Sequence, residues 1–155
     1  MYPLKMYLAI FAVAYILIGC QPDTVSVRPN DEFIKSFISE NNINVAEIVK
    51  YKQYTAIAFR NDREVGLYLD QSGNGRFSKH WENIEGNVSP KRFIGGFNDK
   101  YLVEYIIDED ILNQIHTYKT KEGTFKKEPN QKCFVFPTGT GGITYVDHNN
   151  KPIII

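Results

Sequence analysis

The sequence predicts a mainly β fold, an antiparallel sandwich-like domain or a partly open barrel, with one short N-terminal helix. Apolar and polar residues alternate with a period of two along several segments, as they do in strands with one buried face. Turn signals rich in glycine and asparagine separate these segments at intervals of about 8–12 residues, which is typical of sandwiches and barrels. Helical periodicity marks one segment near residue 31.

The first 19 residues predict a secretory signal peptide. Lys5 is the only cation before an uncharged, mostly apolar run over residues 7–18. A membrane-spanning helix needs about 20 apolar residues, and the polar Gln21-Pro22-Asp23 stops this run from extending. The alternative interpretation is a short signal anchor that is not cleaved.

Leu17-Ile18-Gly19-Cys20, at the end of this run, resembles the lipobox of bacterial lipoproteins. In that family the cysteine thiol receives a diacylglyceryl group, the chain is cut before it, and the new amino terminus is usually acylated with chains such as palmitate. The resemblance implies a mature chain that begins at lipidated Cys20 and is held on the extracytoplasmic face of the cell membrane. Two or more acyl chains suffice for stable anchoring. We expect no cofactor besides this covalent lipid.

The charges of the remaining chain are balanced. The full chain has 18 basic and 18 acidic side chains, and removal of Lys5 with residues 1–19 leaves a net charge of −1. Such a balance does not indicate the basic surface that binds nucleic acid, nor a polybasic patch that binds the membrane surface. We therefore expect attachment through lipid and no nucleic-acid partner. Residues 20–29 read as the lipidated cysteine and a short polar tether, and residues 30–155 as a single β-rich domain.

Cys133 is the second cysteine of the chain. If Cys20 carries lipid, Cys133 has no disulfide partner, so the domain is not a disulfide scaffold. Its apolar neighbours favour a buried thiol that packs as a small hydrophobe. A catalytic cysteine would need an activating base beside it in the fold.

The elements follow in order along the chain. Asn30 and the acidic Asp31 and Glu32 predict a helix start, with an apolar stripe that runs from Phe33 to Ile38 and a break at Asn41-Asn42. Three or four antiparallel strands in meander order follow over residues 45–60, 64–70 and 76–82, with turns at 61–63 and 71–75. The second half predicts strands at 93–97, 101–107 and 132–136, a helical turn after 108, a hairpin of 115–121 with 124–127, and a pairing of 143–147 with 152–155.

The order of strands and turns over residues 101–155 loosely resembles the C-terminal part of small, mostly uncharacterised secreted or lipid-anchored proteins of low-GC Gram-positive bacteria. The shared features are the acidic corner, the Gly123 hairpin, the aromatic strand at Phe134-Val135-Phe136 and the segment 147–151 before a last apolar strand. The resemblance implies no activity.

Two loops match parts of known ligand-binding motifs. Asp70 to Gly75 matches the first half of a calcium loop, but Trp81 stands at position 12 instead of glutamate, so we interpret the segment as a hairpin turn. Thr138 to Gly142 lacks the Gly-Lys-Ser/Thr ending of a phosphate-binding loop and precedes a strand, so we interpret it as an interstrand loop.

The remaining polar candidates lack a local motif. His80 and Glu82 share a strand face, and His116 and His148 lie far off in sequence, so a metal site would have to be assembled by the fold. Asp108, Glu109 and Asp110 are adjacent on a corner and do not provide the separated carboxylate pair of glycoside hydrolysis. Serine nucleophile motifs are also missing from the sequence. We assign no catalytic, cofactor-binding or metal residue; the single site residue that we assign is Cys20, for lipidation.

Aromatic side chains are in excess on the expected strands. Their alternation directs some of them outward, where Tyr and Trp favour contacts with proteins or sugars, although cross-strand packing explains many of them. The members are Tyr51, Tyr54, Tyr68, Trp81, Tyr101, Tyr105, Tyr118 and Tyr145.

These observations favour a non-catalytic lipoprotein that presents a binding surface to a protein or cell-wall partner. The alternatives are an inhibitor or immunity lipoprotein and, less favoured, an envelope-acting hydrolase. The enzyme hypothesis requires a concave pocket with convergent polar groups.

Overall fold

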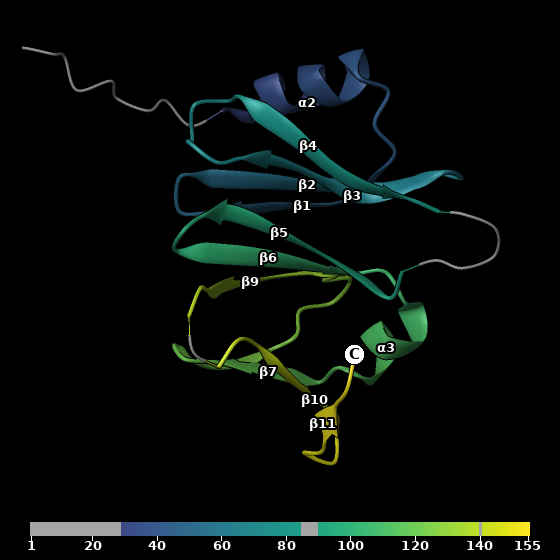
Figure 1. The fold of residues 1–155 in the computed structure, drawn as a ribbon, viewed down its shortest axis with the longest axis vertical. Coiled ribbons are helices and arrows are strands. Elements are labelled where there is room, and N and C mark those ends of the chain that lie inside the picture. Colours follow the sequence, from purple (N-terminus) through teal and green to yellow (C-terminus); the bar gives the residue numbers. More distant parts are fainter. Residues whose placement is uncertain (1–28, 85–89, 140) are drawn as a thin grey trace, which may run out of the picture.

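The computed structural model describes residues 29–84, 90–139 and 141–155. The predicted signal peptide and Cys20 lie outside these residues. The fold is mainly β, with three antiparallel sheets that do not close into a barrel in the described part of the chain (Figure 1). Sheet A has the order β1-β2-β3-β4, sheet B the order β5-β6-β9, and sheet C the order β11-β10-β7-β8. The helix α2 (Asp31–Glu40) lies on the outer face of sheet A, and α3 (Glu109–Gln114) lies beside sheets B and C (Figure 1).

The helix α2 begins where the sequence predicts it. The Asn30 side chain caps its first turn by accepting the N–H of Phe33 at 2.8 Å, and Asn41 ends it. Ile34 is buried, and Phe37 packs on Tyr68 and Phe77 of sheet A, with ring centroids 5.4 and 4.5 Å away. This packing confirms that one face of the helix covers the sheet.

Sheet A is the predicted meander, but the segment 45–60 contains a turn that was not predicted from the sequence. Its strands are β1 (Val45–Tyr51), β2 (Tyr54–Arg60), β3 (Glu64–Asp70) and β4 (Phe77–Asn83). The β1–β2 hairpin turns at Lys52-Gln53, where Lys52 has a φ of 55°, a conformation that non-glycine residues adopt infrequently. Every residue of β2 except Arg60 is buried because α2 covers one face of the sheet and sheet B covers the other.

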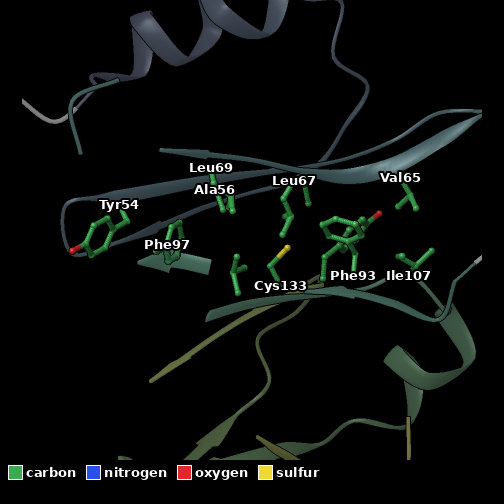
Figure 2. Packing of buried hydrophobic residues seen from close by; sticks show 12 residues of the cluster. Tyr54, Ala56, Val65, Leu67, Leu69, Phe93, Phe97, Ile107 and Cys133 are labelled. Carbon is green, nitrogen blue, oxygen red and sulfur yellow. The ribbon is translucent and has the colours of Figure 1, made fainter. Parts of the chain in front are cut away.

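Sheet B consists of β5 (Arg92–Asn98), β6 (Tyr101–Ile106) and β9 (Cys133–Pro137). Its odd-numbered residues face sheet A and form the main core with Ala56, Val65, Leu67 and Leu69 (Figure 2). Gly95 lies where the two sheets approach each other closely, because a Cβ there would lie 2.8 Å from Leu69 Cδ1 and 3.0 Å from Leu67 Cδ1. The predicted face of Val103, Tyr105 and Ile107 is therefore confirmed.

Sheet C consists of the hairpin β7 (Thr117–Thr120) and β8 (Gly123–Lys126), together with β10 (Thr144–Val146) and β11 (Pro152–Ile153). A second core between sheets B and C contains Ile111, Ile115, Phe134 and Tyr145. Both predicted C-terminal hairpins are confirmed. The acidic corner is confirmed as a short helix, α3, and no described helix is long and apolar enough to cross a membrane.

Candidate functional site

The Asp70 loop is a hairpin turn, as predicted. The buried Asp70 carboxylate accepts the backbone N–H groups of Ser72 at 3.3 Å, Asn74 at 3.2 Å and Gly75 at 2.9 Å. Both carboxylate oxygens therefore stabilise the turn between β3 and β4, in the way that aspartate shapes local turns.

The fold brings two of the three histidines together. The centroids of the His116 and His148 rings lie 4.3 Å apart. His116 directly precedes β7, and His148 lies in the β10–β11 turn. His80 lies apart from them on the exposed edge strand β4, 3.1 Å from the Ser78 hydroxyl, and Glu82 follows on the same strand. Among the described residues, no group of three or more His, Cys, Asp or Glu side chains has the arrangement of a metal site.

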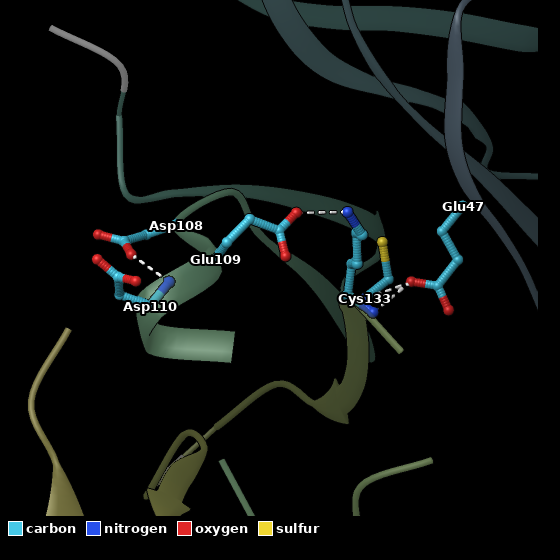
Figure 3. A network of polar contacts seen from close by, with 6 residues as sticks. Glu47, Asp108, Glu109, Asp110 and Cys133 are labelled. Atoms are coloured by element: carbon cyan, nitrogen blue, oxygen red, sulfur yellow. Dashed lines mark hydrogen bonds and ion pairs between the residues drawn. The ribbon is translucent and has the colours of Figure 1, made fainter. Parts of the chain in front are cut away.

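The acidic corner has a structural role in the fold. Asp108 caps α3 by accepting the N–H groups of Asp110 at 3.0 Å and Ile111 at 3.1 Å. Glu109 accepts from Lys132 Nζ at 2.6 Å and so connects the corner to the start of β9 (Figure 3). Two of the three neighbouring carboxylates therefore position α3 against the sheet.

The glycine-rich loop after β9 precedes a strand, as predicted. Gly139, Gly141 and Gly142 have positive φ values, and the chain then enters β10. The Thr138 carbonyl accepts from Lys121 Nζ at 3.0 Å, which connects the loop to the β7–β8 turn.

Cys133 is a buried thiol, as the sequence predicts. Its sulfur lies in the core between sheets A and B (Figure 2), and burial raises the pKa of the Cys133 thiol well above its ordinary value, with the nearby Glu47 carboxylate acting in the same direction. Glu47 accepts the backbone N–H groups of Lys132 at 2.8 Å and Cys133 at 2.5 Å (Figure 3). A buried thiol with a raised pKa is inert, because the thiolate is the nucleophile.

A buried carboxylate that the sequence analysis did not single out joins sheets B and C. Glu104 lies on β6 in the core, where it accepts from Arg92 Nη1 at 2.9 Å and from the Tyr145 hydroxyl at 2.8 Å. Burial and the adjacent carboxylate raise the pKa of Tyr145, which stays a neutral donor. The sequence feature that indicates this buried carboxylate is that Glu104 is the single charged residue in the apolar segment 101–107.

A cleft of about 260 Å³ lies between the β1 edge, the β7–β8 hairpin and the free edge of β9, and we name it the hairpin cleft. Aromatic side chains from three strands line it: Tyr51 of β1, Tyr118 of β7 and Phe125 of β8. Tyr118 and Phe125 are stacked with ring centroids 5.3 Å apart, and Phe125 remains 39% exposed. Tyr51 and Tyr118, two members of the aromatic excess, therefore line this cleft together with Phe125.

The floor and mouth of the hairpin cleft are polar in places. Val49 and Val135 supply apolar surface, and Thr120, Glu122 and Gln131 supply polar groups. Glu122 is the only charged residue among the described residues that line the cleft. Lys52 lies near the cleft, but its Nζ hydrogen-bonds the Tyr101 hydroxyl and lies 4.2 Å from the centroid of that ring.

The other aromatic candidates are divided between core and surface. Tyr54, Tyr105 and Tyr145 are buried, and Tyr68 is covered by α2, which agrees with packing roles. Trp81 is 46% exposed on β4, with Lys79 Nζ 5.2 Å from its ring.

Other depressions are lined by fewer aromatic rings. A depression of about 310 Å³ next to β2 contains Arg60, Asp62 and the ion pair of Glu109 with Lys132, so charges of both signs already oppose each other there. One of about 440 Å³ between α2 and β1 is lined by Ile34 and Ile48 with the Asp31–Lys50 pair. The hairpin cleft combines several aromatic rings with one carboxylate and a strand edge, and it is therefore the candidate site.

Comparison of the chain with protein-family models, with curated proteins and with solved structures finds no match.

Proposed function

We propose that this protein is a lipid-anchored, extracytoplasmic binding module whose hairpin cleft holds its ligand. The hairpin cleft carries the proposal, because its aromatic rings come from three strands and remain partly accessible. Tyrosine and other aromatic rings are the side chains most enriched at recognition surfaces.

The buried reactive groups support a binding role in preference to a catalytic one. Asp70 accepts backbone N–H groups of its turn, Glu104 holds Arg92 and Tyr145, and the Cys133 thiol has a raised pKa. The contacts of the two carboxylates stabilise the fold, and the raised pKa keeps the Cys133 thiol protonated at neutral pH.

The resemblance of residues 17–20 to a lipobox supports the anchor. Residues 21–30 separate Cys20 from α2, and such a segment spans at most about 35 Å when extended. Because α2 and sheet C lie at opposite ends of the long axis (Figure 1), a lipid on Cys20 would hold the α2 end near the bilayer and leave sheet C turned outward.

Metabolic labelling with a fatty acid tests the anchor. We expect label in the wild-type chain and none in Cys20→Ala, together with release of that variant from the membrane fraction. Cys133→Ala is the matched control and should keep its label, because Cys133 is buried. Label that persists in Cys20→Ala would contradict the proposal.

Cross-linking from intact cells tests the binding role. We expect a discrete adduct with a protein or cell-wall component for the wild-type chain. A one-to-one adduct with a secreted hydrolase or toxin would instead favour the inhibitor hypothesis.

A further inference from the structure

We propose that the hairpin cleft binds an extended peptide segment, which pairs with the free edge of β9 at Val135 and places a basic side chain against Glu122. This inference rests on the proposed binding function and specifies the ligand of the same cleft.

The register of sheet B identifies the free edge. Ile106 N–H donates to Lys132 O at 2.9 Å, and Glu104 and Leu102 are then the partners of Phe134 and Phe136. Hydrogen-bonded pairs recur every second residue in an antiparallel ladder, so Phe134 and Phe136 bond to β6. The backbone N–H and C=O groups of Cys133, Val135 and Pro137 consequently point away from β6.

The backbone donors at the two ends of this edge are already bonded or absent. The Cys133 N–H donates to Glu47, and its C=O accepts from Gln131 Nε2 at 3.0 Å. Pro137 has no N–H to donate. Between them, Val135 has no comparable side-chain cap within the described part of the chain, and it lines the hairpin cleft.

The N–H and C=O groups of one residue on a free strand edge can both bond to a single residue of an added strand. A peptide residue that pairs with Val135 satisfies both groups, and its neighbours' side chains alternate to the two sides of the strand. The cleft volume of about 260 Å³ lies below the ~300–1,000 Å³ of pockets for drug-sized molecules, so it suits a short stretch of chain.

The walls of the cleft determine which side chain fits. Aromatic faces attract a cation, and the Tyr118 and Phe125 rings stand on the same hairpin as Glu122. Lysine or arginine presents an apolar stem to such rings and a charge to the carboxylate. Two cations near Glu122 already have partners: Lys52 donates to the Tyr101 hydroxyl of sheet B, and Lys121 donates to the Thr138 carbonyl.

The probe is the peptide acetyl-Thr-Val-Lys-Val-Thr-amide, titrated into the ¹⁵N-labelled full chain in detergent micelles. We expect the Val135 amide to show a large downfield proton shift, because it gains an acceptor. A matched peptide with norleucine in place of lysine should bind about three- to tenfold more weakly, the loss expected for one charge-assisted contact. A third peptide, N-methylated on alternate residues, cannot donate to the Val135 carbonyl and should not bind.

Variants separate the backbone contact from the side-chain contact. Val135→Pro removes the free N–H, and Pro137 shows that β9 accommodates proline at an outward position. We expect about a tenfold loss of affinity in Val135→Pro, against less than threefold in the control Val135→Ala. Glu122→Gln, in an exposed turn, should remove the preference for lysine over norleucine and leave the circular dichroism spectrum unchanged.

Equal binding of the lysine and norleucine peptides, or binding that is unchanged in Val135→Pro, would overturn the inference. Absence of binding at millimolar peptide would do the same. Fatty-acid labelling of Cys20 and cross-linking of a different ligand class do not depend on these peptides, so the proposed function and this inference fail separately.

Discussion

Replacement of Glu104 by alanine would leave the Tyr145 hydroxyl in the core without its acceptor. Tyr145 is buried and donates to Glu104 at 2.8 Å, and Arg92 donates to the other carboxylate oxygen at 2.9 Å. An unsatisfied buried hydroxyl costs about 1–3 kcal/mol, and the cavity left by the truncated side chain adds about 1–2 kcal/mol. Arg92 is partly exposed and reaches water. We therefore expect Glu104→Ala to lower the free energy of unfolding by about 3–4 kcal/mol, close to the loss for a broken buried pair.

A double-mutant cycle tests the pairwise part of this loss. Glu104→Leu alone should be destabilising, because it leaves the Tyr145 hydroxyl without its acceptor. The further change Tyr145→Phe should then recover about 1–3 kcal/mol, because it removes that unsatisfied hydroxyl. In the wild-type background, Tyr145→Phe should cost about 1–3 kcal/mol, since it leaves one oxygen of Glu104 with one donor fewer. The exposed Glu82 of β4 is the matched control, and Glu82→Ala should change stability by less than about 0.5 kcal/mol.

Urea unfolding, followed by circular dichroism and by the fluorescence of the single tryptophan, Trp81, gives each free energy. A loss below about 1 kcal/mol in Glu104→Ala would refute the reasoning. So would an equal cost of Tyr145→Phe in both backgrounds, because the two side chains would then act independently.

Three further predictions follow from the packing and the pKa shifts. Gly95→Ala should lower the free energy of unfolding by about 1–3 kcal/mol, because its Cβ would lie 2.8 Å from Leu69. The control Gly96→Ala should lower it by less, because the nearest contact of its Cβ would be at 3.7 Å. Equal urea midpoints of the two variants would contradict this prediction. The Cys133 thiol should react with a thiol reagent at pH 8 at the rate of unfolding, and immediate reaction of the native chain would contradict its burial. Burial raises the pKa of Tyr105 to about 12 in the folded chain, whereas tyrosine in the unfolded chain ionises near pH 10. The free energy of unfolding should therefore fall as the pH rises from about 10 to 12. A urea midpoint that stays constant over this range would refute the raised pKa of Tyr105.

Local patterns in the sequence predicted most individual elements. Alternation placed Val65, Leu67 and Leu69 on one buried face, and Asn30 marked the helix start. The hairpin at Lys52-Gln53 was missed because neither residue type is a turn signal, and Lys52 takes a positive φ without glycine. The pairing of β1 with β2 up to Tyr51 and Tyr54 places the turn at these two residues.

The division into three sheets could not be predicted from these patterns. The strand β9 follows the β7–β8 hairpin in the chain, yet it pairs with β6 in a different sheet. Alternation specifies which residues of a strand are buried and leaves its partner open, because the partner depends on contacts between distant segments.

The hairpin cleft was hidden from the sequence for the same reason. Its rings come from β1, β7 and β8, and its floor comes from β9, so no local spacing marks the site. Tyr51 and Tyr118 stood out only as members of a general aromatic excess. The free edge at Val135 follows from the sheet order, which required the structure.

Site-specific photo-cross-linking on intact cells tests the central claim that the hairpin cleft is the contact surface. A photoreactive phenylalanine analogue replaces Phe125, 39% exposed at the cleft, or Ile94, 46% exposed on β5 and outside it, each in the full chain. We predict a discrete adduct from position 125 that mass spectrometry traces to a peptide segment containing lysine or arginine, and no such adduct from position 94. Equal adducts from both positions, or an adduct from position 94 alone, would contradict the account.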